Sequence, residues 1–69
     1  MVIIKWTNKY SNESGYVKEV KTKDKHFVNT YDQDEAKSYK TETSASKIID
    51  KLIAFGEADN NDFELVITE

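Results

Sequence analysis

The segment TSASKIIDKLIAF, residues 43–55, decides the fold because it has the clearest helical periodicity in the chain. Its apolar side chains recur at the spacing of an amphipathic helix, with one face formed by Ala45, Ile48, Ile49, Leu52 and Ile53. Thr41 or Thr43 can cap the first turn, and Gly56 follows at the position where glycine commonly ends a helix. We therefore predict one helix with a single apolar face.

The residues before this helix alternate as strands do. In VIIKWTNKY, residues 2–10, apolar and polar side chains alternate, with Ile3 as the exception. The loop SNESG then leads to YVKEVKTK, residues 16–23. A two-residue connection, Asp24-Lys25, leads to HFVNTY, residues 26–31. We expect three strands joined in a meander.

The remaining segments complete an α+β domain. DQDEAKSY, residues 32–39, predicts one or two helical turns capped by Asp32, and FELVIT, residues 63–68, alternates as a fourth strand. We expect a single domain, residues 1–69, in which one amphipathic helix packs on one face of a four-stranded sheet (β-β-β-α-β). The favoured strand order is 3-2-1-4. If the helix doubles back after the third strand, the last strand runs parallel to the first or lies beside the third.

A pairing register assigns the side chains of the first three strands to two faces. We expect Trp6 to face Val20 and Thr22 to face Phe27. The face toward the helix then collects Val2, Ile4, Trp6, Tyr10, Tyr16, Val20, Phe27 and Tyr31. The outer face collects Lys5, Lys9, Lys21, Lys23 and His26, with Ile3, Val17, Val28 and Val66 among them. We expect nothing else in the chain to cover this outer face.

Composition narrows the class of protein. The 69 residues include no cysteine, and the ten strongly basic residues are all lysine, against thirteen acids. Residues 1–40 carry a net charge of +2 (eight lysines, six acids) and residues 41–69 a net charge of −5 (two lysines, seven acids). No apolar run approaches the about 18 residues that cross a bilayer. We expect a cytoplasmic protein without disulfides.

The sequence offers little for catalysis. His26 is the only imidazole, and it lies at a turn beside Asp24 with no G-x-S-x-G nucleophile motif in the chain. Only two glycines are present, too few for a phosphate-binding loop. The acidic stretch from Asp32 does not match an EF-hand, because Lys37 stands where that loop needs glycine. We expect no enzyme activity, cofactor, metal or small-molecule substrate.

The outer sheet face is the candidate interaction surface. Its proposed partner-binding residues are Lys5, Lys9, Val17, Lys21, Lys23, His26 and Val28. Mixed apolar and charged residues on a small domain suit a protein partner or a homodimer. The alternative is nucleic acid held by lysines, although the chain has no arginine and its aromatic side chains are assigned to the other face. Equally, the lysines can simply keep a one-sided sheet soluble.

The stretch HFVNTYDQDEAKSYKTETSASKIIDKL, residues 26–52, resembles small uncharacterised proteins encoded by phages and prophages of low-GC Gram-positive bacteria. The shared features are a short strand, a polar DEAK turn, the step Tyr39-Lys40-Thr41, a helix opened by Ala45 and a terminal FELV strand. The resemblance implies a small accessory or regulatory protein. It supplies no functional residues.

Overall fold

Four strands and one α-helix form the protein, and a computed structural model describes them over residues 1–68. The elements in chain order are β1 (Val2–Asn8), β2 (Ser14–Lys21), β3 (His26–Thr30), the 3₁₀ turn η1 (Gln33–Glu35), α1 (Glu42–Ala54), the 3₁₀ turn η2 (Glu57–Asp59) and β4 (Asn61–Ile67). The strands lie in one sheet in the order β3-β2-β1-β4. The predicted α+β class and strand order are confirmed.

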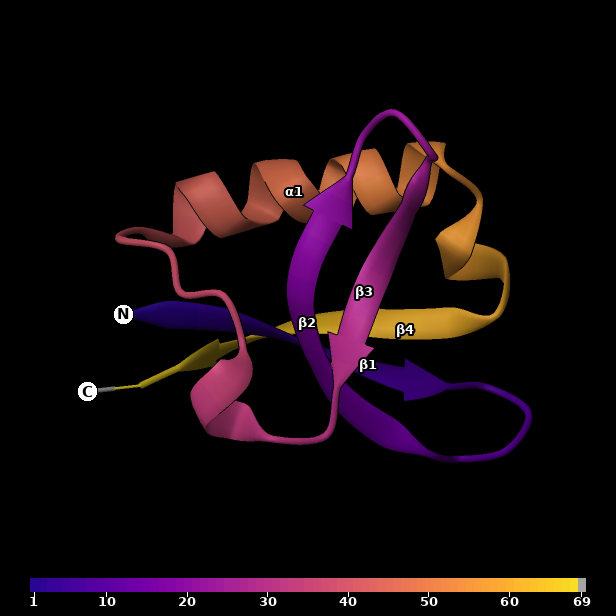
Figure 1. The fold of residues 1–69 in the computed structure, drawn as a ribbon, viewed down its shortest axis with the longest axis horizontal. Coiled ribbons are helices and arrows are strands. Elements are labelled where there is room, and N and C mark those ends of the chain that lie inside the picture. Colours follow the sequence, from indigo (N-terminus) through magenta and orange to yellow (C-terminus); the bar gives the residue numbers. More distant parts are fainter. Residues whose placement is uncertain (69) are drawn as a thin grey trace.

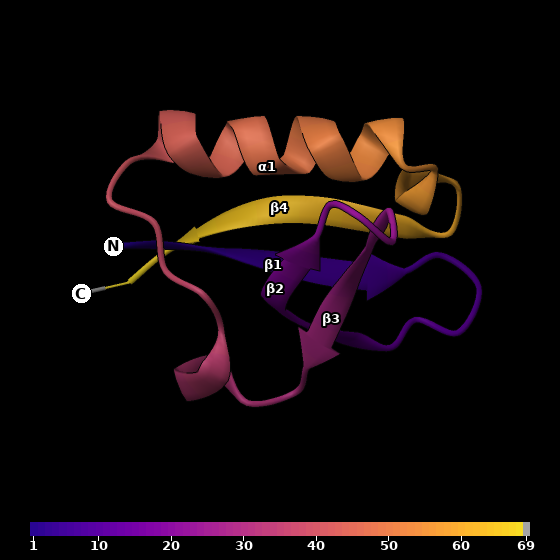
Figure 2. The same ribbon diagram turned by 45° about the horizontal axis from the view of Figure 1, so that its top comes forward.

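The helix covers one face of the sheet, and η1 lies on the opposite side (Figures 1 and 2). The core lies between the sheet and α1, and its most buried side chains are Val2, Ile4, Trp6, Val17, Ala45 and Leu52. The apolar faces that the strand and helix periodicities predict therefore pack against each other in one layer.

The expectation of a parallel last strand is wrong, because β4 pairs antiparallel with β1. The chain after β3 doubles back through residues 31–41 before α1 begins. The helix then runs in the same direction as β1, and β4 returns against both (Figure 1). The connecting segment, rather than the helix, makes the reversal.

Local chemistry sets both ends of α1. The Oγ1 atom of Thr41 accepts a hydrogen bond from the backbone N–H of Ser44 at 3.2 Å, which caps the first turn. After the helix, Gly56 has φ of 91°, a left-handed conformation that glycine adopts without a steric penalty. Among residues 1–68, no helix combines the length and apolar character needed to cross a membrane.

The predicted register between the first two strands is wrong. Trp6 pairs with Gly15 and Lys5 with Tyr16, whereas Trp6 was expected opposite Val20. The turn starts immediately after β1, because Oδ1 of Asn8 accepts hydrogen bonds from the backbone N–H groups of residues 10 and 11, each at 2.9 Å. The register differs by an odd number of residues, so it turns β2 over.

The turned strand changes which side chains are buried. Tyr16 moves to the outer face, and Tyr10 lies in the β1–β2 turn with 78% of its surface exposed. Val17 takes the core position instead and is completely buried. The predicted positions of Tyr10 and Tyr16 on the inner face and of Val17 on the outer face are therefore wrong.

A β-bulge returns the end of β2 to the expected face. The pairing with β3 shifts between Val17 and Glu19, so Lys18 is the extra residue. With this insertion, Val17 and Val20 both reach the core although they are three residues apart. The β2–β3 connection spans residues 22–25 rather than two residues, and Val20 pairs with Phe27. Phe27 still faces inward as predicted.

Candidate interaction surfaces

The segment from Asp32 to Tyr39 covers part of the outer face, contrary to the expectation that nothing in the chain does so. Ile3 is on this face and only 3% exposed. Beside it is a hollow of about 260 Å³ lined by Met1, Ile3, Gln33, Asp34, Ala36, Ser38 and Thr68. The outer face is thus open only beyond this covered region.

Backbone hydrogen bonds hold this segment between β1 and β2 where the two strands diverge. The N–H of Lys37 donates to the carbonyl of Val17 at 3.1 Å. Val2 and Tyr39 exchange two hydrogen bonds, of 2.8 and 2.7 Å. Because β1 pairs with β2 only from Lys5 onward, the segment satisfies polar groups that the short ladder leaves open. Burial of Tyr39 in this position raises the pKa of its phenol.

Val17 does not belong to the proposed partner-binding surface. Its side chain is fully buried in the core on the inner face. The cause is the β1–β2 register described above, which places Val17 on the same face as Trp6.

Lys5 and Lys9 lie near acids of β4 rather than with the other predicted residues. Nζ of Lys5 is 3.8 Å from Oε1 of Glu64. Nζ of Lys9 donates to the carbonyl of Ala58 at 2.8 Å and is 3.7 Å from Oδ1 of Asp62. Lys9 is thus held within the chain by a hydrogen bond, and both ammonium groups lie within 4.0 Å of a carboxylate without donating a hydrogen bond to it.

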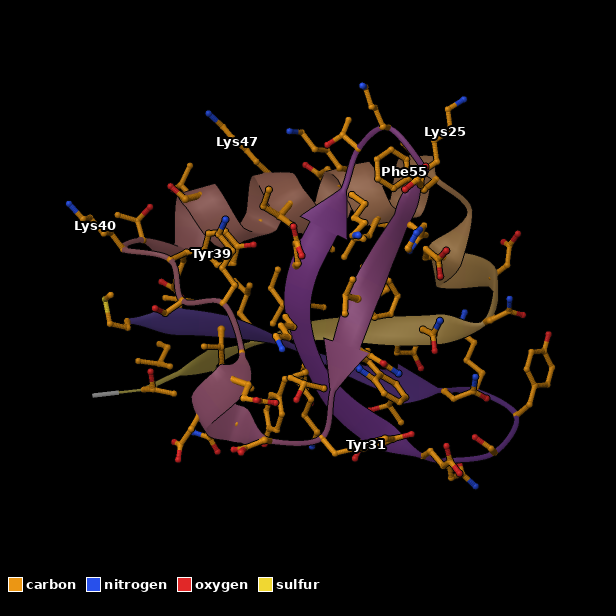
Figure 3. The ribbon with its side chains drawn as sticks, in the orientation of Figure 1. Lys25, Tyr31, Tyr39, Lys40, Lys47 and Phe55 are labelled. Carbon is orange, nitrogen blue, oxygen red and sulfur yellow. The ribbon has the colours of Figure 1, made fainter. Side chains whose placement is uncertain are left out.

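The other predicted residues gather on the β2–β3 hairpin. Lys21 pairs with His26 across the strands, and Lys23 lies in the connecting turn. Val28 pairs with Glu19 on the outer face and is half-buried. The turn also holds Lys25, which extends outward from the hairpin tip (Figure 3). We call Lys21, Lys23, Lys25, His26 and Val28 the hairpin surface.

The lysines of the hairpin surface differ from Lys5 and Lys9 in their ion pairing. Among residues 1–68, no carboxylate lies within 4.0 Å of the ammonium groups of Lys21, Lys23 or Lys25. The nearby Asp24 instead lies 3.8 Å from Nε2 of His26. The hairpin surface therefore presents three ammonium groups to solvent.

The sequence analysis missed a hollow on the inner face. It has a volume of about 240 Å³ and is lined by Trp6, Asn8, Glu13, Phe27, Asn29, Tyr31 and Asn61. The rings of Trp6 and Tyr31 meet edge to face with centroids 5.9 Å apart, and Oη of Tyr31 donates to Oε2 of Glu13 at 3.3 Å. The alternation of Phe27, Asn29 and Tyr31 in the predicted strand 26–31 was the available signal, since it places an amide between two aromatic rings.

The lining of this hollow limits its chemistry. No lysine lines it, and Trp6 is only 5% exposed, so the arrangement lacks both the cations and the open ring face used to bind single-stranded nucleic acid. His26 lies on the outer face, away from Glu13 and the amides. The hollow therefore has one carboxylate but no imidazole to act with it.

No known protein family, curated protein or solved structure matches the chain.

Proposed function

We propose that the protein is a small non-enzymatic interaction module that binds an acidic protein partner through the hairpin surface. The observation that carries the proposal is the clustering: Lys21, Lys23 and Lys25 lie together on one hairpin, and none has a carboxylate within 4.0 Å among residues 1–68. Ammonium groups that are not neutralised within the chain attract an acidic partner and accelerate its association.

The hairpin also provides a short apolar contact. Val28 is half-buried on the outer face and lies in the same sheet as the lysine-bearing strand. In the proposed interface Val28 adds apolar contact area, and the lysines around it form the polar rim. In keeping with the resemblance to phage-encoded proteins, the proposed partner is a host or phage protein with an acidic surface.

The experiment is affinity capture with two charge-reversed variants. The first carries Lys21→Glu and Lys23→Glu. The matched control carries Lys40→Glu and Lys47→Glu, which make the same change in net charge near the start of α1, away from the hairpin tip (Figure 3). We expect the hairpin variant to lose its acidic partner and the control to retain it. Equal recovery by both variants would refute the proposal.

Nucleic acid is the alternative ligand for the same lysines, and a second comparison separates it. Capture is repeated after nuclease treatment, and binding to a DNA duplex is measured by gel shift over a range of salt concentrations. A protein partner remains after nuclease treatment. A gel shift that weakens steeply with salt, together with recovery that nuclease abolishes, would instead assign the lysines to phosphate contacts.

A further inference from the structure

In the part of the chain that the structure describes, the outer edge of β4 has no strand beside it. β4 is the last strand in the sheet order and pairs only with β1 in the described part of the chain. It spans seven residues, and its register with β1 is continuous from Val2↔Ile67 to Asn8↔Asn61. It contains neither the bulge nor the proline that commonly protects an edge strand.

The hydrogen bonds at the two ends of the β1–β4 ladder show which backbone groups are free. Met1 and Thr68 exchange hydrogen bonds of 2.9 and 2.8 Å, and Lys9 donates to Asn60 at 2.8 Å. Bonding residues alternate along an antiparallel strand, so the residues of β4 that bond to β1 are Asp62, Glu64 and Val66. The N–H and C=O groups of Phe63, Leu65 and Ile67 therefore point to the free side.

The neighbourhood of this edge is acidic. Residues 57–68 contain four acids and no basic residue: Glu57, Asp59, Asp62 and Glu64. The side chains of Asp62 and Glu64 are 73% and 62% exposed. Lys9 and Lys5 approach them only at 3.7 and 3.8 Å, beyond hydrogen-bonding distance, so both carboxylates can still accept hydrogen bonds from a further cation.

From these observations we propose that the free edge of β4 binds an extended basic peptide segment of a protein partner by strand addition. The added strand hydrogen-bonds to Phe63, Leu65 and Ile67, and its alternate lysine or arginine side chains lie beside Asp62 and Glu64. Ile67 is 70% exposed at the end of the edge and provides an apolar contact on the opposite face. The β4 strand of a second copy fits less well, because it would bring the same acids together.

This site is independent of the hairpin surface, so either proposal can fail without the other. The test uses a short capped peptide in which lysine and valine alternate, with the corresponding glutamate–valine peptide as the control. Binding to the full chain is followed by amide NMR. We expect the lysine peptide to shift the amide signals of Phe63, Leu65 and Ile67. It should also slow hydrogen exchange of these amides with solvent more than it slows exchange of the Asp62 and Glu64 amides.

Two variants of the chain make the test specific. Ile67→Pro removes an outward N–H at an exposed position without removing a bond to β1, and should weaken binding at least several-fold. The pair Asp62→Asn and Glu64→Gln keeps the backbone donors and should abolish the preference for lysine over glutamate. Equal binding of both peptides to the unaltered chain, or amide shifts confined to β3, would overturn the proposal. So would protection of the β4 amides by self-association without peptide.

Discussion

Replacing Gly15 with alanine tests the packing between β1, β2 and β3. A Cβ atom at Gly15 would lie 2.8 Å from the carbonyl oxygen of Thr30 and 2.8 Å from Cζ2 of Trp6. Both distances are below 3.0 Å, which is too short for a non-bonded contact of a methyl carbon with oxygen or carbon, so both neighbours must move. The Thr30 oxygen belongs to the backbone and cannot rotate away, and Trp6 is held by the hydrogen bond from its Nε1 to the carbonyl of Tyr16 at 3.2 Å.

The expected cost follows from this double contact. Overpacking a core usually costs about 1–3 kcal/mol, and we place Gly15→Ala at about 2–3 kcal/mol because one contact is rigid. The free energy of unfolding is measured by urea denaturation with far-ultraviolet circular dichroism. With a urea dependence of about 1 kcal/mol per molar for a small domain, the midpoint should fall by about 2–3 M.

A double-mutant cycle identifies the tryptophan as one cause of this cost. Trp6→Phe removes the indole atoms nearest to the new methyl group, so Gly15→Ala should cost at least about 1 kcal/mol less in that background. Gly56→Ala is the control, because no atom of residues 1–68 lies within 4 Å of its added Cβ atom and only its φ of 91° is unfavourable. Its cost should be the same with either residue at position 6. A Gly15→Ala midpoint within experimental error of the unaltered protein would refute the reasoning.

Two further predictions concern the core and the covering segment. Leu52→Ala should lower the free energy of unfolding by about 2–5 kcal/mol, because the side chain is completely buried. Ile53→Ala, at a position that is 52% exposed, should lower it by less than about 1 kcal/mol. Thermal unfolding followed by circular dichroism compares the two variants, and equal losses of stability would contradict the placement of α1. Burial raises the pKa of Tyr39, so its stabilising contribution is complete below its ordinary value of about 10 and is lost as pH rises through the higher folded-state pKa. The free energy of unfolding, measured by urea titration, should therefore fall less between about pH 8 and about pH 11 for Tyr39→Phe than for the unaltered protein. An equal fall in both proteins would show that Tyr39 is not the titrating group.

The features that the sequence predicts correctly depend on neighbouring residues. The helix follows from the spacing of Ala45, Ile48 and Leu52, and its end follows from Gly56. The strand order β3-β2-β1-β4 was also predicted correctly, but it depends on pairing between the two ends of the chain, and the direction of β4 was not predicted correctly.

The errors arise where distant residues decide the structure. The register of β2 depends on the close approach of Trp6 to Gly15 and on the side chain of Asn8, and alternation within either strand reveals neither. The bulge at Lys18 then restores the expected face for Val20, so the sequence places Val20 and Phe27 correctly and Val17 incorrectly. Among the predicted partner-binding residues, those of the β2–β3 hairpin lie close together in the structure, because they flank a single turn.

The segment that binds both β1 and β2 has a consequence for the cooperativity of folding. In the described part of the chain the direct β1–β2 ladder contains only three residue pairs, and so short a pairing is marginal by itself. The bonds of Lys37 to Val17 and of Tyr39 to Val2 join the two strands through a third part of the chain. We therefore expect the amide hydrogens of Val2, Lys37 and Tyr39 to exchange together, as one opening unit, rather than as a fraying loop.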